Sequence, residues 1–140
     1  METASPRSES WNSERIHHTL HYIMRNINER PRVYISLPMA GRDEKEIMEE
    51  IRLMRQAAEE RGWEPVDPVE VNQGLPGGYP EKLGRDIAAL LRCDAIMMGS
   101  QWERSAGCRL EMRAATIYKI EIYGSCHEFK NFQRMIQEAW

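Results

Sequence analysis

The run Arg32-Val33-Tyr34-Ile35-Ser36 decides the fold, because it sets the type of the first regular element in the folded domain. It is rich in β-branched and aromatic residues and ends at Leu37-Pro38, which is typical of a buried strand that enters a loop. Apolar side chains then recur every three or four residues from Ile47 to Ala58. That spacing predicts a helix of about five turns that starts with a capping box formed by Asp43 and Glu46.

The same alternation of strand and helix continues along the chain. The stretch from Asn72 to Pro80 holds too many glycines and prolines for regular structure, so we expect a rim or lid loop there. Strands that alternate with crossover helices are parallel, and the helices cover both faces of the sheet. The predicted fold class is α/β, a three-layer doubly wound parallel sheet of four to five strands, flavodoxin- or Rossmann-like. The other predicted elements are strands at 63–66, 95–98 and 120–123 and helices at 81–92 and 106–118.

Three regions are expected. Residues 1–12 are rich in Ser and charge and predict a flexible tail, because they offer too little apolar surface to offset the entropy of ordering. Residues 13–30 carry apolar side chains at helical spacing after Ser13, a candidate N-cap, and predict an added N-terminal helix. The α/β domain is expected at 31–140. Its last apolar stripe is either core or the cover of a subunit interface, and consists of Phe129, Phe132, Ile136 and Trp140.

Composition argues against several classes of partner. The formal charge of -3 arises from 19 basic and 22 acidic residues spread along the chain, so no strong field attracts a nucleic acid polymer or an anionic membrane. The cysteines, Cys93, Cys108 and Cys126, are odd in number and far apart, which argues against a disulfide framework. There is no secretory signal and no apolar run of about 18 residues, so we expect a soluble, cytoplasmic protein.

Neither a cofactor nor a metal is expected. No GxGxxG motif follows the first strand and no GxxxxGK[ST] motif occurs, which removes the main dinucleotide and P-loop interpretations. His17 and His21 are one helical turn apart, but no third ligand is suitably spaced, and a solvated helix face explains them better than a metal site.

Polar residues gather in the loops where a ligand crevice is expected. In an open parallel sheet the crevice lies beyond the carboxyl ends of the strands. The loops at 37–42, at 99–105 and around Gly77-Gly78 should converge there. The stretch from Ser105 to Glu111 is the most informative, because it combines a hydroxyl, the small Gly107 and a carboxylate at the start of a helix whose free amides could hold an anion.

Two carboxylates are candidates for chemistry. Glu111 has only small helical neighbours, Gly107, Ala114 and Ala115, so a substrate could reach it, although a solvated helix glutamate is the alternative. Asp86 lies at the edge of an apolar helix face, where partial burial would raise its pKa and suit a proton donor. Its alternative is a boundary carboxylate that only accepts hydrogen bonds.

Three segments resemble a known family in their order and spacing. They are Tyr34-Ile-Ser-Leu-Pro-Met-Ala-Gly41, the segment from Asp86 to Cys93-Asp94-Ala95, and the segment from Trp102 through Ser105-x-Gly107-x3-Glu111 to Ala114. Together they resemble the nucleoside 2-deoxyribosyltransferases and the related deoxynucleoside 5'-monophosphate N-glycosidases. The similarity runs from about residue 33 to residue 124 and is greatest to small, uncharacterised bacterial and phage members.

The resemblance implies roles for the carboxylates. In that family the glutamate of the Gly-x3-Glu motif is the nucleophile and forms a covalent glycosyl intermediate, and Glu111 matches it. The matching aspartate, Asp86, would assist the departing base, and Asp94 would have a structural task. A carboxylate nucleophile divides one displacement into two easier steps, and a nearby helix N-terminus should favour ionised Glu111.

The resemblance also implies substrate contacts. Ser105 and Gly107 favour a 5'-phosphate, because the monophosphate glycosidases carry a serine there. Leu37 replaces the usual glycine of the first loop and Ala40 replaces an arginine, for which Arg42 would compensate. Tyr34 and Met39 match positions near the sugar and base, although core packing is an equal alternative. The complete set of expected substrate-binding residues is Tyr34, Ser36, Met39, Gly41, Arg42, Trp102, Ser105 and Gly107.

The function predicted is cleavage of an N-glycosidic bond, or deoxyribosyl transfer, on a nucleoside or its 5'-monophosphate. The resemblance further implies a homo-oligomer, a dimer or higher. One alternative is a nucleotide-binding sensor or interaction module that lacks catalysis. Another is a structural role in which an apolar helix face docks a partner and no ligand binds.

Overall fold

The computed structural model describes residues 30–124. The chain divides into one unit up to Arg30 and a second unit that begins at Pro31. The expected tail, the expected N-terminal helix as far as residue 29, the two histidines 17 and 21, Cys126 and the apolar stripe at 129–140 lie outside the described residues.

The centre of the domain is a parallel sheet. Its four strands lie in the order β2-β1-β3-β4, and every neighbouring pair is parallel. Tyr34 of β1 is opposite Val66 on one side and Ile96 on the other, so the central strands are buried within the sheet. The predicted doubly wound α/β class is thereby confirmed. The strands are β1 (Arg32–Ser36), β2 (Glu64–Val66), β3 (Ala95–Met98) and β4 (Glu121–Gly124).

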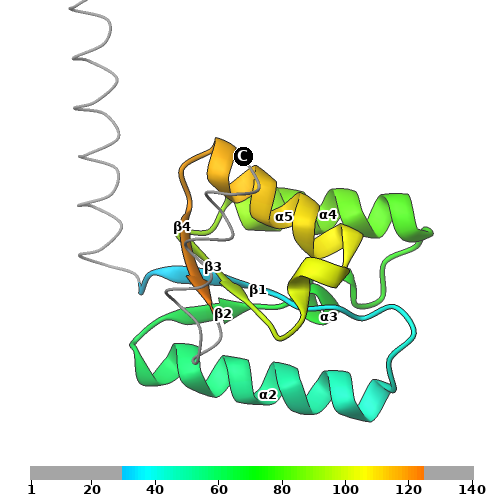
Figure 1. Cartoon of the computed structure of the whole chain (residues 1–140), viewed down its shortest axis with the longest axis horizontal. Coiled ribbons are helices and arrows are strands. Elements are labelled where there is room, and N and C mark those ends of the chain that lie inside the picture. The colour runs from blue at the N-terminus through cyan, green and yellow to red at the C-terminus, as the bar shows by residue number, and fades with distance from the viewer. Residues whose placement is uncertain (1–29, 125–140) are drawn as a thin grey trace, which may run out of the picture. The chain divides into compact units, whose positions relative to one another are not determined.

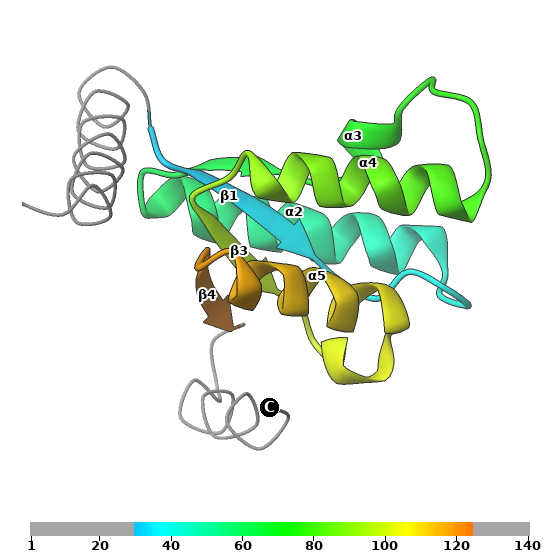
Figure 2. The ribbon, with the colours of Figure 1, turned by 90° about the horizontal axis from the view of Figure 1, so that it is seen from above.

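Helices cover both faces of this sheet. Figure 1 shows α2 on one face and α4 and α5 on the other, and Figure 2 shows α4 and α5 running side by side. In the sheet, β2 lies on one side of β1, whereas β3 and β4 lie on the other. Because every crossover has the same hand, helices that lead in the two opposite directions cover opposite faces of the sheet. The helices are α2 (Glu44–Glu60), α3 (Pro68–Asn72), α4 (Tyr79–Leu91), the short 3-10 helix η1 (Trp102–Arg104) and α5 (Ala106–Ile117).

Side chains of the strands alternate between the two faces of the sheet and form one apolar cluster on each face. On one side Val33 and Ile35 pack with Met54 and Ala58 of α2. On the other side Tyr34, Ile96 and Met98 pack with Leu90 of α4 and with Met112 and Ala115 of α5. This two-sided burial explains why the central strands read as continuous apolar runs.

The predicted capping box and one predicted helix start were wrong, and one short helix was not predicted. Asp43 is the N-cap of α2 but its side chain makes no capping hydrogen bond, so the predicted capping box is not formed. The short helix α3 was not predicted; Asp67 caps it by accepting from the Glu70 N–H and Pro68 occupies its first turn, while the expected irregular stretch follows it at residues 73–78. The next helix also begins earlier than predicted, at Tyr79, where the Glu81 carboxylate accepts from the Gly78 N–H.

Gly99 is required where β3 ends beside β1. Its N–H donates to the Ser36 carbonyl over 2.6 Å. A Cβ at this position would lie 2.8 Å from both the Glu50 Oε1 and the Leu37 Cβ and 3.2 Å from the Ser36 carbonyl oxygen. The two strands and the start of their loops therefore approach more closely than any side chain at residue 99 allows.

We expect Gly99→Ala to lower the free energy of unfolding by about 1–3 kcal/mol, because the added methyl group overpacks this junction. The matched control is Gly84→Ala in α4, where a Cβ would meet no atom within 4 Å. The control should raise stability by about 0.5–1 kcal/mol, since alanine favours a helix interior over glycine. Urea unfolding of both variants measures the difference, and equal effects would contradict the close approach at Gly99.

Among residues 30–124 there is no helix with the length and apolar character that crossing a membrane requires.

Candidate functional site

A cavity of about 420 Å³ lies at the carboxyl ends of β1 and β3. That volume is within the range of small-molecule sites. Its walls come from the loop after β1, the N-terminal half of α4, and the segment that contains η1 and the start of α5. Two of the three predicted loops thus converge as expected, while the glycine-rich loop contributes through Tyr79, which follows Gly78.

Glu111 lines this cavity from α5, although its side chain is largely buried. The residue is 6% exposed, which excludes the alternative of a solvated helix glutamate. Its Oε1 accepts a hydrogen bond from the Ser36 hydroxyl over 3.2 Å. Its Oε2 is buried and has no hydrogen-bond partner within the described part of the chain. A buried carboxylate oxygen without a donor is costly, and it is therefore a candidate to meet a ligand.

Burial raises the pKa of Glu111 to about 7. The negative charge of Asp86 adds to this rise, while the hydroxyl groups of Tyr34 and Ser36 oppose it. The expectation that the helix N-terminus would favour the ionised form is outweighed, because Glu111 comes after the first turn of α5, where the dipole has weakened. Glu111 therefore exchanges its proton near neutral pH.

Tyr34 lies behind Glu111 and is fully buried. Its hydroxyl is near enough to favour the charged form of Glu111, but the two groups fall short of hydrogen-bond geometry and the hydroxyl has no partner among residues 30–124. Burial and the nearby carboxyl groups raise the pKa of Tyr34 far above its usual value, so the phenol stays protonated.

Asp86 reaches the same cavity from α4. It is 8% exposed, and its Oδ1 accepts from the Asn72 amide over 2.7 Å. Burial raises the pKa of Asp86 to about 6, against the opposing effects of Asn72, Arg85 and Lys82. The sequence predicted this direction and its cause. The cavity thus holds two carboxyl groups that both titrate within the physiological range, an arrangement that is common at acid–base sites.

Cys108 also lines the cavity, beside Glu111, and would be a rival nucleophile if its thiol ionised. Burial raises the pKa of this thiol above its usual value. The reactive form of a cysteine is the thiolate, so a thiol held protonated is a poor nucleophile. Glu111 is the better candidate.

The residues expected to bind a phosphate have other partners as well. The Ser105 hydroxyl oxygen caps α5 by accepting from the Cys108 N–H over 3.2 Å. Gly107 lines the cavity, and a Cβ there would lie 3.3 Å from the Tyr79 hydroxyl, so the small residue keeps this wall open. Arg42 donates to the Pro38 carbonyl over 2.8 Å and pairs with Glu50 over 2.7 Å. Its positive charge is therefore largely compensated within the protein.

The other expected contacts divide into three groups. Met39 lines the cavity, as do Arg42, Ser105 and Gly107. Ser36 and Tyr34 are fully buried in β1 behind Glu111 and do not line it. Gly41 and Trp102 do not line it either, and their role as substrate contacts stays a prediction. Trp102 is 8% exposed and packs in the apolar cluster under α4 and α5, and Gly41 serves the turn after β1 with a φ of +73°.

The sequence analysis did not name several lining residues as site residues, among them Tyr79, Leu83, Gln101 and Arg104. Tyr79 is 63% exposed and was assigned to an irregular loop, so no pattern indicated that it faces Gly107. Arg104 lies in η1, one residue before the Ser105 cap, and is a cation on this rim. The early start of α4 could have been found from Glu81, which is suitably spaced to cap Gly78.

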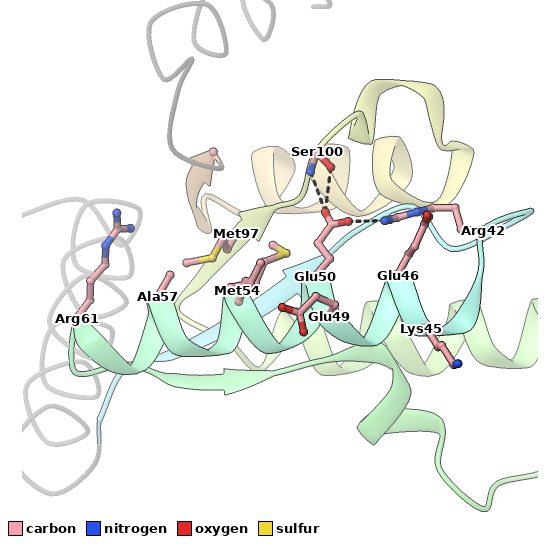
Figure 3. Close-up of a pocket in the computed structure, with 12 residues that line it drawn as sticks. Arg42, Lys45, Glu46, Glu49, Glu50, Met54, Ala57, Arg61, Met97 and Ser100 are labelled. Carbon is pink, nitrogen blue, oxygen red and sulfur yellow. Dashed lines mark hydrogen bonds and ion pairs between the residues drawn. The ribbon is translucent and has the colours of Figure 1, made fainter.

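Glu50 of α2 connects the two loops that carry the cavity. Its Oε1 accepts from both the backbone N–H and the hydroxyl of Ser100, each over 3.1 Å, while its Oε2 pairs with Arg42. Figure 3 shows the Glu50 carboxylate between these two partners. They also line a second hollow of about 770 Å³ along α2, whose apolar floor includes Met54 and Met97. Residues fifty positions apart make this clamp, so no local sequence pattern predicted it.

The raised pKa of Glu111 predicts how the free energy of unfolding depends on pH. Between about pH 4.5 and 7 the folded state keeps a proton that the unfolded state has lost, so this group's contribution to stability falls as the pH rises. We expect Glu111→Gln to raise the free energy of unfolding at pH 8 by on the order of 3 kcal/mol and to have little effect at pH 4.

Urea unfolding at the two pH values measures this change. The matched control is Glu59→Gln on the exposed side of α2, which removes one negative charge without changing the site. A pH-independent effect of Glu111→Gln, equal to that of the control, would show that the carboxyl group is not desolvated in the folded protein.

A family model and solved structures match this chain, whereas the curated proteins do not. No curated protein matches the chain. Among solved structures, the CMP N-glycosidase BcmB of Clostridium botulinum is similar at 14% sequence identity, with a TM-score of 0.46 over 78% of this chain and 99% of that one. A family model described as a domain of unknown function, DUF4406, matches residues 31–123. Because that match covers the sheet, all described helices and the cavity, the chain belongs to the DUF4406 family.

Proposed function

We propose that this domain cleaves the N-glycosidic bond of a nucleoside or deoxynucleoside, or of its 5'-monophosphate, by hydrolysis or by transfer. The observation that carries the proposal is the pair of buried carboxyl groups, Glu111 and Asp86, that line one cavity and titrate near neutral pH. The resemblance of the three sequence segments to deoxyribosyltransferases supports the same assignment.

The chemistry needs one charged and one protonated carboxyl group. The unpartnered Oε2 of Glu111 would attack the anomeric carbon as the bond from that carbon to the base nitrogen breaks. The Asp86 proton would move to the leaving base, so the electron pair of the broken bond is neutralised there. Water, or a second base, would then displace Glu111 from the glycosyl ester.

The two groups interact electrostatically, because the negative charge of Asp86 raises the pKa of Glu111. Between pH 6 and 7 the pair holds about one proton. Since the pKa of Glu111 is the higher of the two, the productive form with charged Glu111 and protonated Asp86 is the minor one in the free protein. The Ser36 and Tyr34 hydroxyls favour charged Glu111, and a bound base near Asp86 would favour the acid form there.

The substrate class is narrower than a general carbohydrate. A cavity of about 420 Å³ suits one nucleoside or mononucleotide. Met39, Leu83 and Tyr79 offer apolar and aromatic surface to a base, whereas Arg104 and the start of α5 offer a cation and backbone amides to a phosphate. Arg42 contributes less than expected to a phosphate site, because Glu50 pairs with it.

Base release tests the proposal directly. The purified full chain is incubated with ribo- and deoxynucleosides and their 5'-monophosphates, and free base is measured by chromatography. Wild type should release base from at least one of them, with a bell-shaped rate profile between about pH 6 and 7 that reflects the carboxyl pair.

Two variants assign the roles. Glu111→Gln should abolish base release, and Asp86→Asn should slow it by about 10²–10⁴-fold, because it removes the general acid. Glu59→Gln is again the control and should act like wild type. Full turnover by Glu111→Gln would refute the nucleophile. Thermal stabilisation by nucleotides without base release would identify a nucleotide-binding module instead.

A further inference from the structure

Asn72, the last residue of α3, makes three hydrogen bonds that no sequence motif predicted. Its Nδ2 donates to the Pro68 carbonyl over 2.8 Å and to the Asp86 Oδ1 over 2.7 Å. Its Oδ1 accepts from the Arg85 Nε over 2.8 Å. The side chain thus connects α3 to the carboxyl group that lines the cavity.

These partners determine which way the Asn72 amide faces. A guanidinium can only donate and a backbone carbonyl can only accept. The amide oxygen must therefore face Arg85, and the amide nitrogen must face Pro68 and Asp86. An amide flip would place a donor against a donor and an acceptor against an acceptor, so the N–H groups stay directed at Asp86.

A fixed donor restricts where Asp86 can carry its proton. The Oδ1 of Asp86 faces an N–H group whether the carboxyl is charged or neutral, and a proton on Oδ1 would oppose that N–H. Among residues 30–124 no side chain donates a hydrogen bond to Oδ2, so no donor opposes a proton on that oxygen. We propose that Asn72 is a positioning residue that directs the acid proton of Asp86 to Oδ2. The meaning of this step for catalysis rests on the proposed function.

The position of Asn72 is itself held from α2. Arg55 pairs with Asp67 over 2.7 Å and with Glu70 over 3.1 Å, and these two acidic residues lie at the start of α3. Asp67 is 5% exposed, so this anchor is better protected from solvent than a typical surface ion pair. The short α3, which could not persist alone, is thereby fixed at a distance that lets Asn72 reach Asp86.

Other charged groups also act on Asp86. Lys82 and Arg85 of its own helix favour the charged form, while Glu111 of α5 and the buried Tyr34 hydroxyl of β1 interact with it from the opposite wall. Asn72 differs from all of these because it contacts one oxygen and not the other. Removing it should therefore change both the titration of Asp86 and the oxygen that is protonated.

The test is a carbon-13 NMR titration of the side-chain carboxyl groups in wild type, Asn72→Ala and Asn72→Asp. We expect an upward shift of the Asp86 titration in both variants, because a donor to the charged form is lost, and a larger one in Asn72→Asp, which adds a second acidic group. Asn72→Asp also keeps the side-chain shape if Asn72→Ala unfolds. The control is Gln73→Ala, the exposed neighbour, which should leave the Asp86 titration unchanged.

Base release provides the second readout. In Asn72→Ala the limb of the rate profile that depends on Asp86 should move to higher pH while the plateau rate falls about ten-fold, since the proton is no longer directed to one oxygen. A purely structural role would lower the rate without moving the limb. An unchanged Asp86 titration in both variants would overturn the inference. If wild type releases no base but the titration shifts as expected, the proposed function fails and the positioning of Asp86 by Asn72 stands.

Discussion

The burial of the Glu111 carboxyl group against the sheet is the constraint on which the site depends. A buried carboxyl group needs a hydrogen-bond donor, and the Ser36 hydroxyl at the end of β1 donates to it over 3.2 Å. The second oxygen is left without a donor in the described range, at the wall of a cavity. The folded protein therefore accepts a local cost in stability to keep a reactive group in place, as functional sites commonly do.

The rest of the domain holds this arrangement from three directions. Glu50 joins the loop after β1 to the loop after β3, and the missing side chain of Gly99 lets these loops begin in close contact. Ser105 caps α5 and so fixes the helix that carries Glu111. Asn72, anchored through α3, holds Asp86 on the opposite wall. Each of these contacts joins elements that are far apart in the chain, so the cavity exists only after the sheet has formed.

Glu111 and Asp86 share one cavity, and this shared position determines how both carboxyl groups titrate. Because both groups are desolvated by the same cavity, their pKa values move toward neutrality together, and one proton is shared near pH 6 to 7. Neutral hydroxyls face Glu111, whereas cationic Lys82 and Arg85 act on Asp86. Burial is the main cause of both shifts, and the two cations contribute to the lower pKa of Asp86. A ligand must therefore shift the proton from Glu111 to Asp86 for the proposed reaction.

Local pattern was sufficient to determine the strands, the main helices and the α/β class, because the periods of two and of 3.6 residues are set by backbone geometry and by which face is buried. It also indicated Glu111 and Asp86 and the direction in which burial changes the pKa of Asp86. Only the tertiary structure decided that Trp102 and Tyr34 pack in the core, that Arg42 is paired with Glu50, and that Tyr79 and Asn72 face the site. The physical reason is that spacing along one element predicts which face a side chain takes, whereas its partner on another element depends on how the sheet brings distant segments together.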